Sequence, residues 1–413
     1  MTQTSLARIG GLLSLPCTLA FPNLSHADFL ADSSATLQLR NFYNNRELRS
    51  HLTAQDKRDE WAQGFMLNLK SGYTEGLVGF GMDLYGALGI KLDSSDARAG
   101  TGLLPNAFGN AGPNQYSDVS GVLKAKISKT ELKVGGFMPK SPVAQSSDAR
   151  LLPPIFNGAT LTSTDIANLS LDMGQFRYAN FRNSSGNHDK IIAANYGVTG
   201  DRFDYFGAKY AITPKVSLSY WRAELQDVYQ QNYLGLLASR DVGSWVLGAE
   251  VGYFDSSEAG SAKAGDIDNR LASALLSAKY GAHTFRAGYE QNFGDSPLPY
   301  LQDTDPYAAN TVQVLEFTRA REKSWQARYD FDFARLGLPG LTFLARYLKG
   351  DGYWVNGRDG KEWERDLDLS YVLQSGPLRN LSLRLRSALV RSDASIGDLD
   401  DTRFIVAYTF LLK

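Results

Sequence analysis

The feature that most constrains this chain is an alternation of apolar and polar residues that recurs from about residue 35 to the end. Stretches of roughly 9 to 13 residues place every second side chain on one face, which is the period of a β-strand rather than of a helix. In the last stretch Phe404, Val406, Tyr408 and Phe410 share one face, while Arg403 lies on the other. The sequence therefore predicts an all-β protein.

The two faces of these stretches favour a membrane barrel over a soluble sandwich. Leu367, Leu369 and Tyr371 alternate with Asp366 and Asp368, so charged groups stand directly behind an apolar and aromatic face. Charged side chains need water, whereas an apolar face flanked by aromatic residues is typical of a wall that contacts lipid. A transmembrane antiparallel β-barrel, with lipid outside and water inside, satisfies both faces.

The connections between the stretches alternate in length. Short turns alternate with long loops, among which are those predicted at 92–117, 139–167 and 294–322. Outer-membrane barrels have this layout, with short turns on the periplasmic side and long loops outside. We count about 18 strands, one of them at 188–197. A barrel of this size keeps an aqueous channel, so we expect inward-folded external loops to narrow it.

The N-terminal segment predicts export. Residues 1–27 have the pattern of a secretory signal peptide, with Arg8 before an apolar stretch and Ala27 at the expected cleavage site. Residues 28–413 then form one barrel in a Gram-negative outer membrane. The single cysteine, Cys17, lies in the leader, which excludes disulfides and cysteine-bound metals from the mature chain. A net charge of −1 indicates no general surface for nucleic acid.

Signatures of catalysis are missing from the sequence. The histidines of the mature chain, His51, His188 and His283, have no metal-ligand spacing, and neither a nucleophile motif nor a phosphate-binding glycine loop is present. We therefore expect no enzymatic activity, no cofactor and no metal. Two alternatives stay open at this point, a barrel-embedded hydrolase and a secreted all-β carbohydrate-binding protein.

Four separated segments are similar to those of one known family. They run from Arg40 to Arg46, from Glu60 to Phe65, from Tyr229 to Tyr233 and from Glu364 to Tyr371. In this order they resemble the OprD family of outer-membrane carboxylate channels of pseudomonads, over essentially the whole mature chain. The resemblance implies a barrel whose third and seventh external loops fold inward to form an eyelet. It also implies a row of lumen arginines, the basic ladder, that leads carboxylates to that eyelet.

The resemblance and the alternation agree on the arginines that face the lumen. The predicted ladder consists of Arg40, Arg286, Arg346, Arg384, Arg386 and Arg403. The resemblance places the third loop at 139–167 and the seventh at 294–322, and their candidate eyelet residues are Arg150, Asp295, Tyr300, Asp303, Asp305 and Tyr307. Guanidinium groups on a narrow wet wall attract carboxylates and can pass them on when no single site binds too tightly. The same arginines could instead only pair with lumen acids, and the loop residues could be solvated surface groups.

These observations predict a passive, substrate-selective diffusion channel for small carboxylates such as aromatic acids or amino acids. The expected partners are those substrates, outer-membrane lipid and lipopolysaccharide, and no nucleic acid. The chain is expected to be a monomer or a weak homotrimer. Its C-terminus departs from the pattern of many outer-membrane barrels, because it ends in Lys413 rather than in an aromatic residue.

Overall fold

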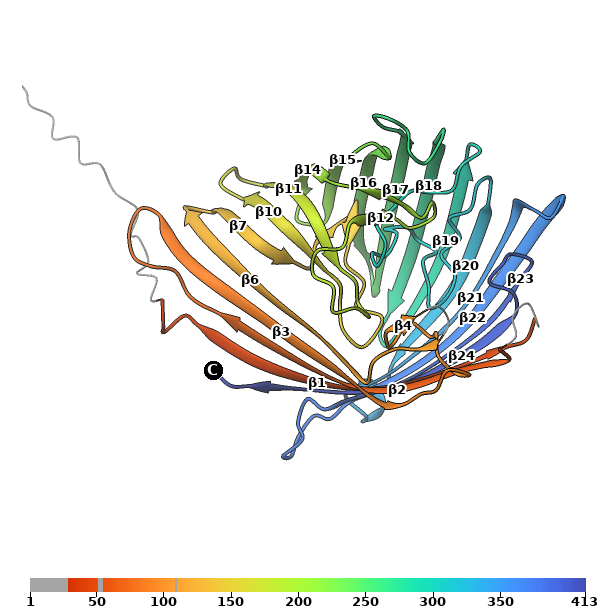
Figure 1. Ribbon diagram of the computed structural model, residues 1–413, viewed down its shortest axis with the longest axis horizontal. Coiled ribbons are helices and arrows are strands. Elements are labelled where there is room, and N and C mark those ends of the chain that lie inside the picture. The colour runs from red at the N-terminus through yellow and green to blue at the C-terminus, as the bar shows by residue number, and fades with distance from the viewer. Residues whose placement is uncertain (1–28, 51–54, 108–109) are drawn as a thin grey trace, which may run out of the picture.

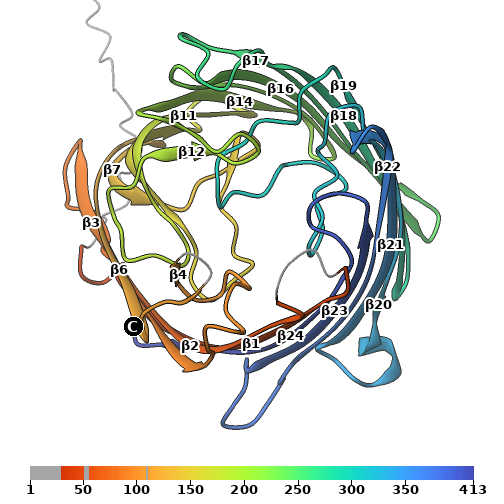
Figure 2. The same cartoon turned by 45° about the vertical axis from the view of Figure 1, so that its right-hand side comes forward.

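The computed structural model describes residues 29–50, 55–107 and 110–413 and forms one closed antiparallel barrel (Figures 1 and 2). The predicted signal peptide lies outside the described residues. The wall has 18 strands. They are β1 (Ser34–Leu48), β2 (Lys57–Lys70), β3 (Gly79–Asp93), β6 (Gln115–Ile127), β7 (Thr130–Phe137), β10 (Ile155–Ser163), β11 (Leu169–Asn180), β14 (Phe203–Thr213), β15 (Val216–Leu225), β16 (Tyr229–Val242), β17 (Trp245–Glu258), β18 (Asp268–Tyr280), β19 (His283–Phe293), β20 (Lys323–Asp332), β21 (Leu341–Val355), β22 (Arg358–Val372), β23 (Ser382–Ser392) and β24 (Leu399–Leu411). The prediction of an all-β barrel is confirmed.

Short elements lie in the connections. Small two-stranded sheets form between β4 (Asn106–Ala107) and β5 (Asn110–Ala111), β8 (Lys140–Ser141) and β9 (Ala144–Gln145), and β12 (Ile191–Ala193) and β13 (Val198–Gly200), and a 3-10 turn, η1 (Phe333–Leu336), follows β20. Among the described residues, no helix is long and apolar enough to cross a membrane.

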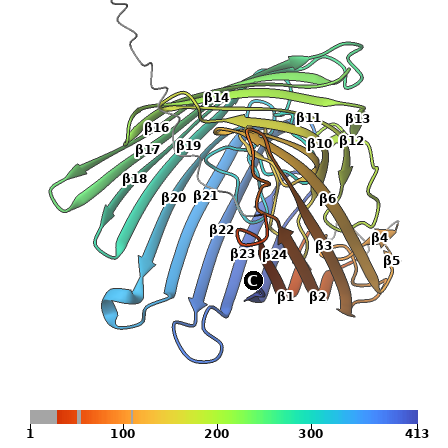
Figure 3. The ribbon, with the colours of Figure 1, turned by 90° about the vertical axis from the view of Figure 1, so that its left-hand side faces the viewer.

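The barrel closes between its first and last strands. β1 pairs with β24 from Thr36 opposite Leu411 to Leu48 opposite Leu399. Backbone groups that face lipid must be hydrogen-bonded within the protein, and closure removes the open edges of the sheet. An even number of strands places both ends of the wall at the same rim as the short hairpin turns, which line one end of the barrel in Figure 3.

The predicted alternation of short and long connections holds over part of the barrel only, because β15 and β16 are joined by just 226–228 and β21 and β22 by just 356–357 at the rim with the long loops. The long ones, all at the opposite rim, are 94–114, 138–154, 181–202 and 294–322, whereas the turns at 128–129, 214–215, 243–244 and 281–282 have two residues each. We call the segments 138–154 and 294–322 loop 3 and loop 7. Both enter the barrel, where Figure 2 shows coil crossing the interior.

Two sequence-based boundaries are wrong, and the two errors cancel in the strand count. The second half of the segment predicted as loop 139–167 is the wall strand β10, which pairs with β7 and β11. The segment 188–197, predicted as a wall strand, instead contains β12, which pairs with β13 in a small separate sheet. The physical reason is composition: β10 carries Gly, Thr and Ser and a register shift after Asn157, whereas Ile191 and Ile192 form an apolar run.

The buried core lies inside the barrel, toward the rim with the long loops. Aromatic side chains of the wall, such as Phe176, Phe203 and Phe254, pack in one cluster with Val143 of loop 3 and Leu301 of loop 7. Apolar burial of this kind stabilises the inward position of both loops, because leaving the barrel would expose that surface to water.

The outer face of the last strand gives the first prediction. Phe404 and Phe410 are 43% and 41% exposed on the outside of the barrel, and Val406 lies between them on the same face. A Val406→Arg substitution is expected to lower the free energy of unfolding by about 2 to 4 kcal/mol, because it places a charge near the middle of the bilayer. Urea unfolding in lipid vesicles measures this, with Val406→Leu as the control. Equal stability of the two variants would contradict a lipid-facing position.

Candidate pore constriction

Loops 3 and 7 are hydrogen-bonded to each other across the lumen. The Ser147 N–H donates to the Asp303 carbonyl at 3.0 Å, and the Asp305 N–H donates to the Gln145 carbonyl at 2.8 Å. Ser146 and Thr304 form an antiparallel bridge between these two bonds. The two loops therefore act as one partition across the barrel.

Inward-facing carboxylates of the wall hold loop 7 in place. Glu364 on β22 accepts hydrogen bonds from the backbone N–H groups of Val314 at 3.0 Å and Leu315 at 2.6 Å. Glu290 on β19 accepts from the Asn310 N–H at 3.1 Å. These hydrogen bonds pair buried backbone N–H groups with side chains of the wall, so they fix the backbone of the loop.

The last strand adds a second attachment for loop 7. Arg403 is fully buried, donates to Asp401 at 2.7 Å and donates to the Gln313 carbonyl at 3.0 Å. The Gln313 side-chain amide donates to Asp401 at 2.9 Å. Arg403 therefore attaches loop 7 to the barrel wall.

Arg40 plays the corresponding part for loop 3. Its guanidinium donates to the Asp148 carboxylate at 2.7 Å and to the Arg150 carbonyl at 2.7 Å, and only 7% of the residue is exposed. Arg150 itself donates to the Thr101 carbonyl at 3.3 Å. Burial, together with nearby arginines, lowers the pKa of the Arg150 guanidinium. The first strand thus fixes the position of loop 3.

A cavity of about 410 Å³ lies where the two loops meet the wall. Arg346 and Arg386 of the wall contribute cationic side chains, whereas Glu250 of β17 and Asp305 and Tyr307 of loop 7 contribute acids and a phenol. Burial and the nearby Glu250 raise the pKa of Tyr307 to about 12, so its hydroxyl keeps its proton. The lining therefore offers guanidinium donors on one side and oxygen acceptors on the other.

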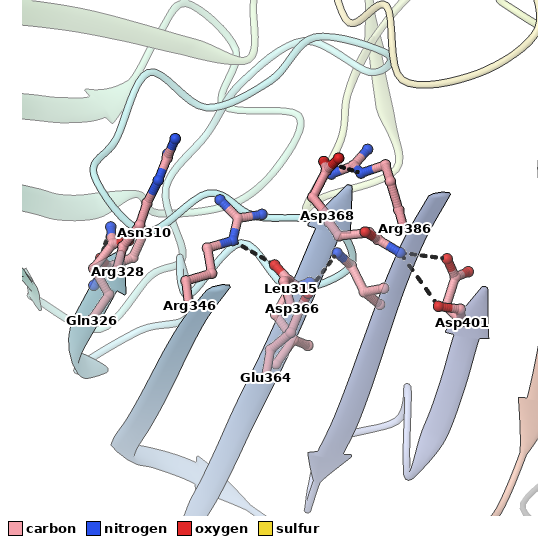
Figure 4. A network of polar contacts seen from close by, with 12 residues as sticks. Asn310, Leu315, Gln326, Arg328, Arg346, Glu364, Asp366, Asp368, Arg386 and Asp401 are labelled. Carbon is pink, nitrogen blue, oxygen red and sulfur yellow. Dashed lines mark hydrogen bonds and ion pairs between the residues drawn. The ribbon is translucent and has the colours of Figure 1, made fainter. Parts of the chain in front are cut away.

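The inward-facing arginines follow a line across neighbouring strands. Arg286, Arg328 and Arg346 are direct register partners on β19, β20 and β21, and Arg346 is paired in turn with Asp366 on β22. Figure 4 shows Arg328, Arg346 and Asp366 side by side on the wall. Because barrel strands are tilted by about 35 to 45°, a line across them also rises along the axis of the pore.

Three aspartates of this wall are each paired with two arginines. The groups are Arg286–Asp330–Arg328, Arg384–Asp368–Arg386 and Arg46–Asp401–Arg403. Two guanidinium groups against one carboxylate leave one positive charge uncompensated in each group. Arg346, in contrast, is paired with Asp366 alone. The lumen arginines thus pair with lumen acids and still carry a surplus of positive charge.

The structure brings only some of the predicted site residues to the cavity. Arg346, Arg386, Arg403, Asp305 and Tyr307 line it. Arg286 and Arg384 lie in two of the three arginine groups described above, outside this lining.

The other predicted residues make contacts within or beside the loops. Asp303 pairs with Arg182 at 2.8 Å, and Asp295 pairs with the exposed Arg321. The Tyr300 hydroxyl donates to Glu316, and burial raises the pKa of this tyrosine. Within the described residues, no cluster of His, Cys, Asp and Glu has the grouping needed to hold a metal ion.

Several residues that lie beside the predicted site residues in the structure were not themselves predicted from the sequence. Arg46 and Arg328 share the parity of the predicted ladder, so the alternation alone could have included them. Glu250 and Glu364 have lumen-facing parity too, but the alternation does not indicate their contacts with loop 7, and Arg182 lies in a connection that the alternation does not describe.

A pH dependence is expected from Asp305. Burial raises the pKa of this carboxyl above its usual range, against the opposing effects of Ser147, Arg182 and Arg150. As the pH falls from neutral, Asp305 gains its proton at a higher pH than an ordinary aspartate and one negative charge leaves the cavity. Preference for chloride over potassium, measured as a reversal potential in a salt gradient, is expected to rise with this protonation. An Asp305→Asn variant should lack this component, and an unchanged pH profile in that variant would contradict the assignment.

Comparisons with known proteins agree with this geometry. The sequence profile described as "outer membrane porin, OprD family" matches residues 27–412. The crystal structure of OccK9 (OpdG) from Pseudomonas aeruginosa is 46% identical, with a TM-score of 0.90 over 93% of this chain and 100% of that chain.

Two further structures from the same organism contain ligands. OpdK, solved with vanillate, is 38% identical with a TM-score of 0.87, and the match covers 93% of this chain and 100% of that chain. OccK2 (OpdF), solved in complex with glucuronate, is 39% identical with a TM-score of 0.85 and the same coverage.

Proposed function

Because the chain belongs to the OprD family of outer-membrane porins, we propose that it admits small carboxylates by passive diffusion along its lumen arginines. The chain is a channel, and family membership excludes the hydrolase and the secreted carbohydrate-binding protein. The observation that carries the proposal is the pairing of single aspartates with two arginines, which leaves positive charge on successive steps of the wall.

The charge surplus is suited to transport rather than to tight binding. A guanidinium can pair with a carboxylate through two hydrogen bonds. At an effective dielectric constant of 20 to 80, one charge pair at 4 Å is worth on the order of 1 to 4 kcal/mol. Each wall aspartate competes with the passing anion for the same arginines. A carboxylate is therefore concentrated at each step and can still leave it.

The cavity at the constriction narrows the substrate class. A volume of about 410 Å³ is of the size that holds one small molecule. Glu250 and Asp305 offer acceptors for hydroxyl groups, while Arg346 and Arg386 offer donors for a carboxylate. Vanillate and glucuronate, the ligands of OpdK and OccK2, each combine one carboxylate with at least one hydroxyl group. We infer that hydroxylated monocarboxylates of this size are the substrates.

Liposome uptake tests this function. Proteoliposomes are supplied at low salt with vanillate or glucuronate and, as neutral counterparts of similar size, with vanillyl alcohol or glucose. The two acids are expected to enter faster than their neutral counterparts. Equal rates within each pair would show that the arginines confer no selectivity and would overturn the proposal.

We also infer that residues 1–27 are a cleaved signal peptide. Their composition supports this, and the family profile begins at residue 27. N-terminal sequencing of protein from isolated outer membranes is expected to begin at Asp28. An N-terminus at Met1 in that fraction would contradict cleavage.

A further inference from the structure

The lipid-facing wall carries a cluster of cations near the rim with the long loops. We call it the outer basic patch, and it consists of Lys323, Lys349, Lys361, Arg365 and Arg391 together with Trp325, Tyr347 and Trp363. These side chains lie on the outer face of β20 to β23, with the same parity as Leu367 and Leu369, which are 40% and 42% exposed. The patch therefore does not belong to the lumen site.

Trp363 lies at the centre of the patch. Its cross-strand neighbours are Lys349 on β21 and Arg391 on β23. Lys361 and Arg365 lie two residues before and after it on the same face of β22. The Arg391 guanidinium lies 5.8 Å from the centre of the Trp363 ring, within the range of a cation–π contact. Each of the four nearest positions around this indole therefore carries a positive charge.

Most of these cations lack an anionic partner. In the part of the chain that the structure describes, the side chains of Lys323, Lys349, Lys361 and Arg365 form no ion pair or hydrogen bond. Asp351 lies between Lys323 and Lys361 in the register without forming an ion pair to either. Arg391 alone is neutralised, by Asp400 at 2.8 Å.

Two outward-facing arginines elsewhere near the same rim have hydrogen-bonding or ionic partners. Arg222 on β15 donates to Gln230 at 2.7 Å and to Asn232 at 3.4 Å. Arg270 on β18 pairs with Asp268 at 3.5 Å. Arg222 and Arg270 thus have polar partners, which the side chains of Lys323, Lys349, Lys361 and Arg365 lack.

The position of the patch indicates what would neutralise it. Lys349 and Lys361 lie on the two strands that the hairpin at 356–357 joins. The ring centres of Trp325 and Tyr347 are 5.6 Å apart, and those of Tyr347 and Trp363 are 5.8 Å apart, so the three rings form a row. An aromatic row of this kind marks the interface between hydrocarbon and headgroups. Lysine and arginine at this depth reach toward the headgroups, and anionic headgroups attract them.

We propose that the outer basic patch binds the phosphorylated sugar headgroup of the glycolipid in the outer leaflet, the lipid A part of lipopolysaccharide. Long loops face outward in such barrels, so this rim meets that leaflet. The unpaired cations extend over three strands, which lie 4.7 to 4.9 Å apart, and over positions two residues apart along a strand, about 6.6 to 6.8 Å. That spread matches a headgroup with two phosphates better than a phospholipid with one.

Binding to detergent-solubilised protein tests the proposal. Purified diphosphoryl lipid A is titrated against wild type and against a Lys349→Gln/Arg365→Gln variant, and affinity is read from fluorescence of the patch tryptophans and by native mass spectrometry. The variant is expected to bind at least tenfold more weakly, since each cation near an anionic surface contributes about 1 kcal/mol. Arg222→Gln is the matched control, because it removes an outward arginine whose neighbours already satisfy it, and it should bind like wild type.

The remaining arms identify the ligand. Phosphatidylglycerol and inorganic phosphate are expected to compete poorly with diphosphoryl lipid A. Equal affinity of all variants for lipid A, an equal loss in Arg222→Gln, or equal affinity for phosphatidylglycerol would each overturn the proposal. Heat-modifiable migration and single-channel conductance should remain those of wild type in every variant, because the substituted side chains lie outside the pore. A failure of this proposal would therefore leave the carboxylate pathway unaffected.

Discussion

Deleting residues 302–314 of loop 7 and joining the ends with a short Gly-Ser linker is expected to raise the single-channel conductance severalfold. This segment includes Asp305, Tyr307 and Gln313, which line the cavity, and Asn310 and Val314, whose N–H groups donate to wall carboxyl groups. A barrel with this number of strands is wide enough for an aqueous channel when nothing fills it. Planar-bilayer recordings in potassium chloride measure the change, and ion selectivity should weaken with it.

A matched deletion controls for general damage to the rim. Residues 260–265, in the connection between β17 and β18, are absent from the lining of the cavity. Their removal is expected to leave the conductance unchanged. If the loop 7 deletion folds into a heat-modifiable barrel and still conducts like wild type, loop 3 or the wall forms the narrowest point instead.

Replacing Arg384 and Arg386 together with alanine is expected to have the second large effect. Both arginines pair with Asp368, so the substitution changes this step of the wall from a surplus of one positive charge to an uncompensated negative charge. Carboxylate uptake at low salt is expected to fall roughly tenfold, consistent with a loss of one to a few kcal/mol of attraction. The loss should shrink at 1 M salt, where the screening length is about 3 Å.

A triple variant separates charge from structure. Adding Asp368→Asn to the double variant removes the carboxylate that has lost both arginine partners, so this part of the wall becomes neutral. Uptake is then expected to recover to a level between the double variant and wild type. Wild-type uptake by a folded double variant at low salt would show that these arginines only neutralise Asp368.

The alternation of side chains predicts the faces of the wall well, but not the pairing across it. Parity places Arg286, Arg346, Arg384 and Arg386 on the lumen face, in agreement with the family resemblance. A slip of two residues between neighbouring strands preserves every face and changes every cross-strand partner. The sharing of Asp368 by two arginines depends on register and local geometry, so parity alone could not predict it.

The loops were harder to predict for a different reason. Arg40 contacts Asp148, and Arg403 contacts Gln313, across long stretches of sequence. Such contacts depend on the path of irregular backbone, which has no period. Arg403 shows the consequence, because its lumen-facing parity was right while its burial beneath loop 7 could not be read from its strand. Strand β10 was missed because small polar residues hide its alternation.

The seam between β1 and β24 bears on the order of events during assembly. Arg40 and Arg46 belong to the strand made first, whereas Asp401 and Arg403 belong to the strand made last. The attachments of loops 3 and 7 therefore include side chains from both ends of the chain. Until β1 and β24 pair, the sheet has two unpaired edges and the Arg46–Asp401 pair across the seam does not exist. Closure of the barrel and completion of the constriction by loops 3 and 7 are thus the same step. A barrel that has not closed would therefore lack both a continuous wall and a selective pore.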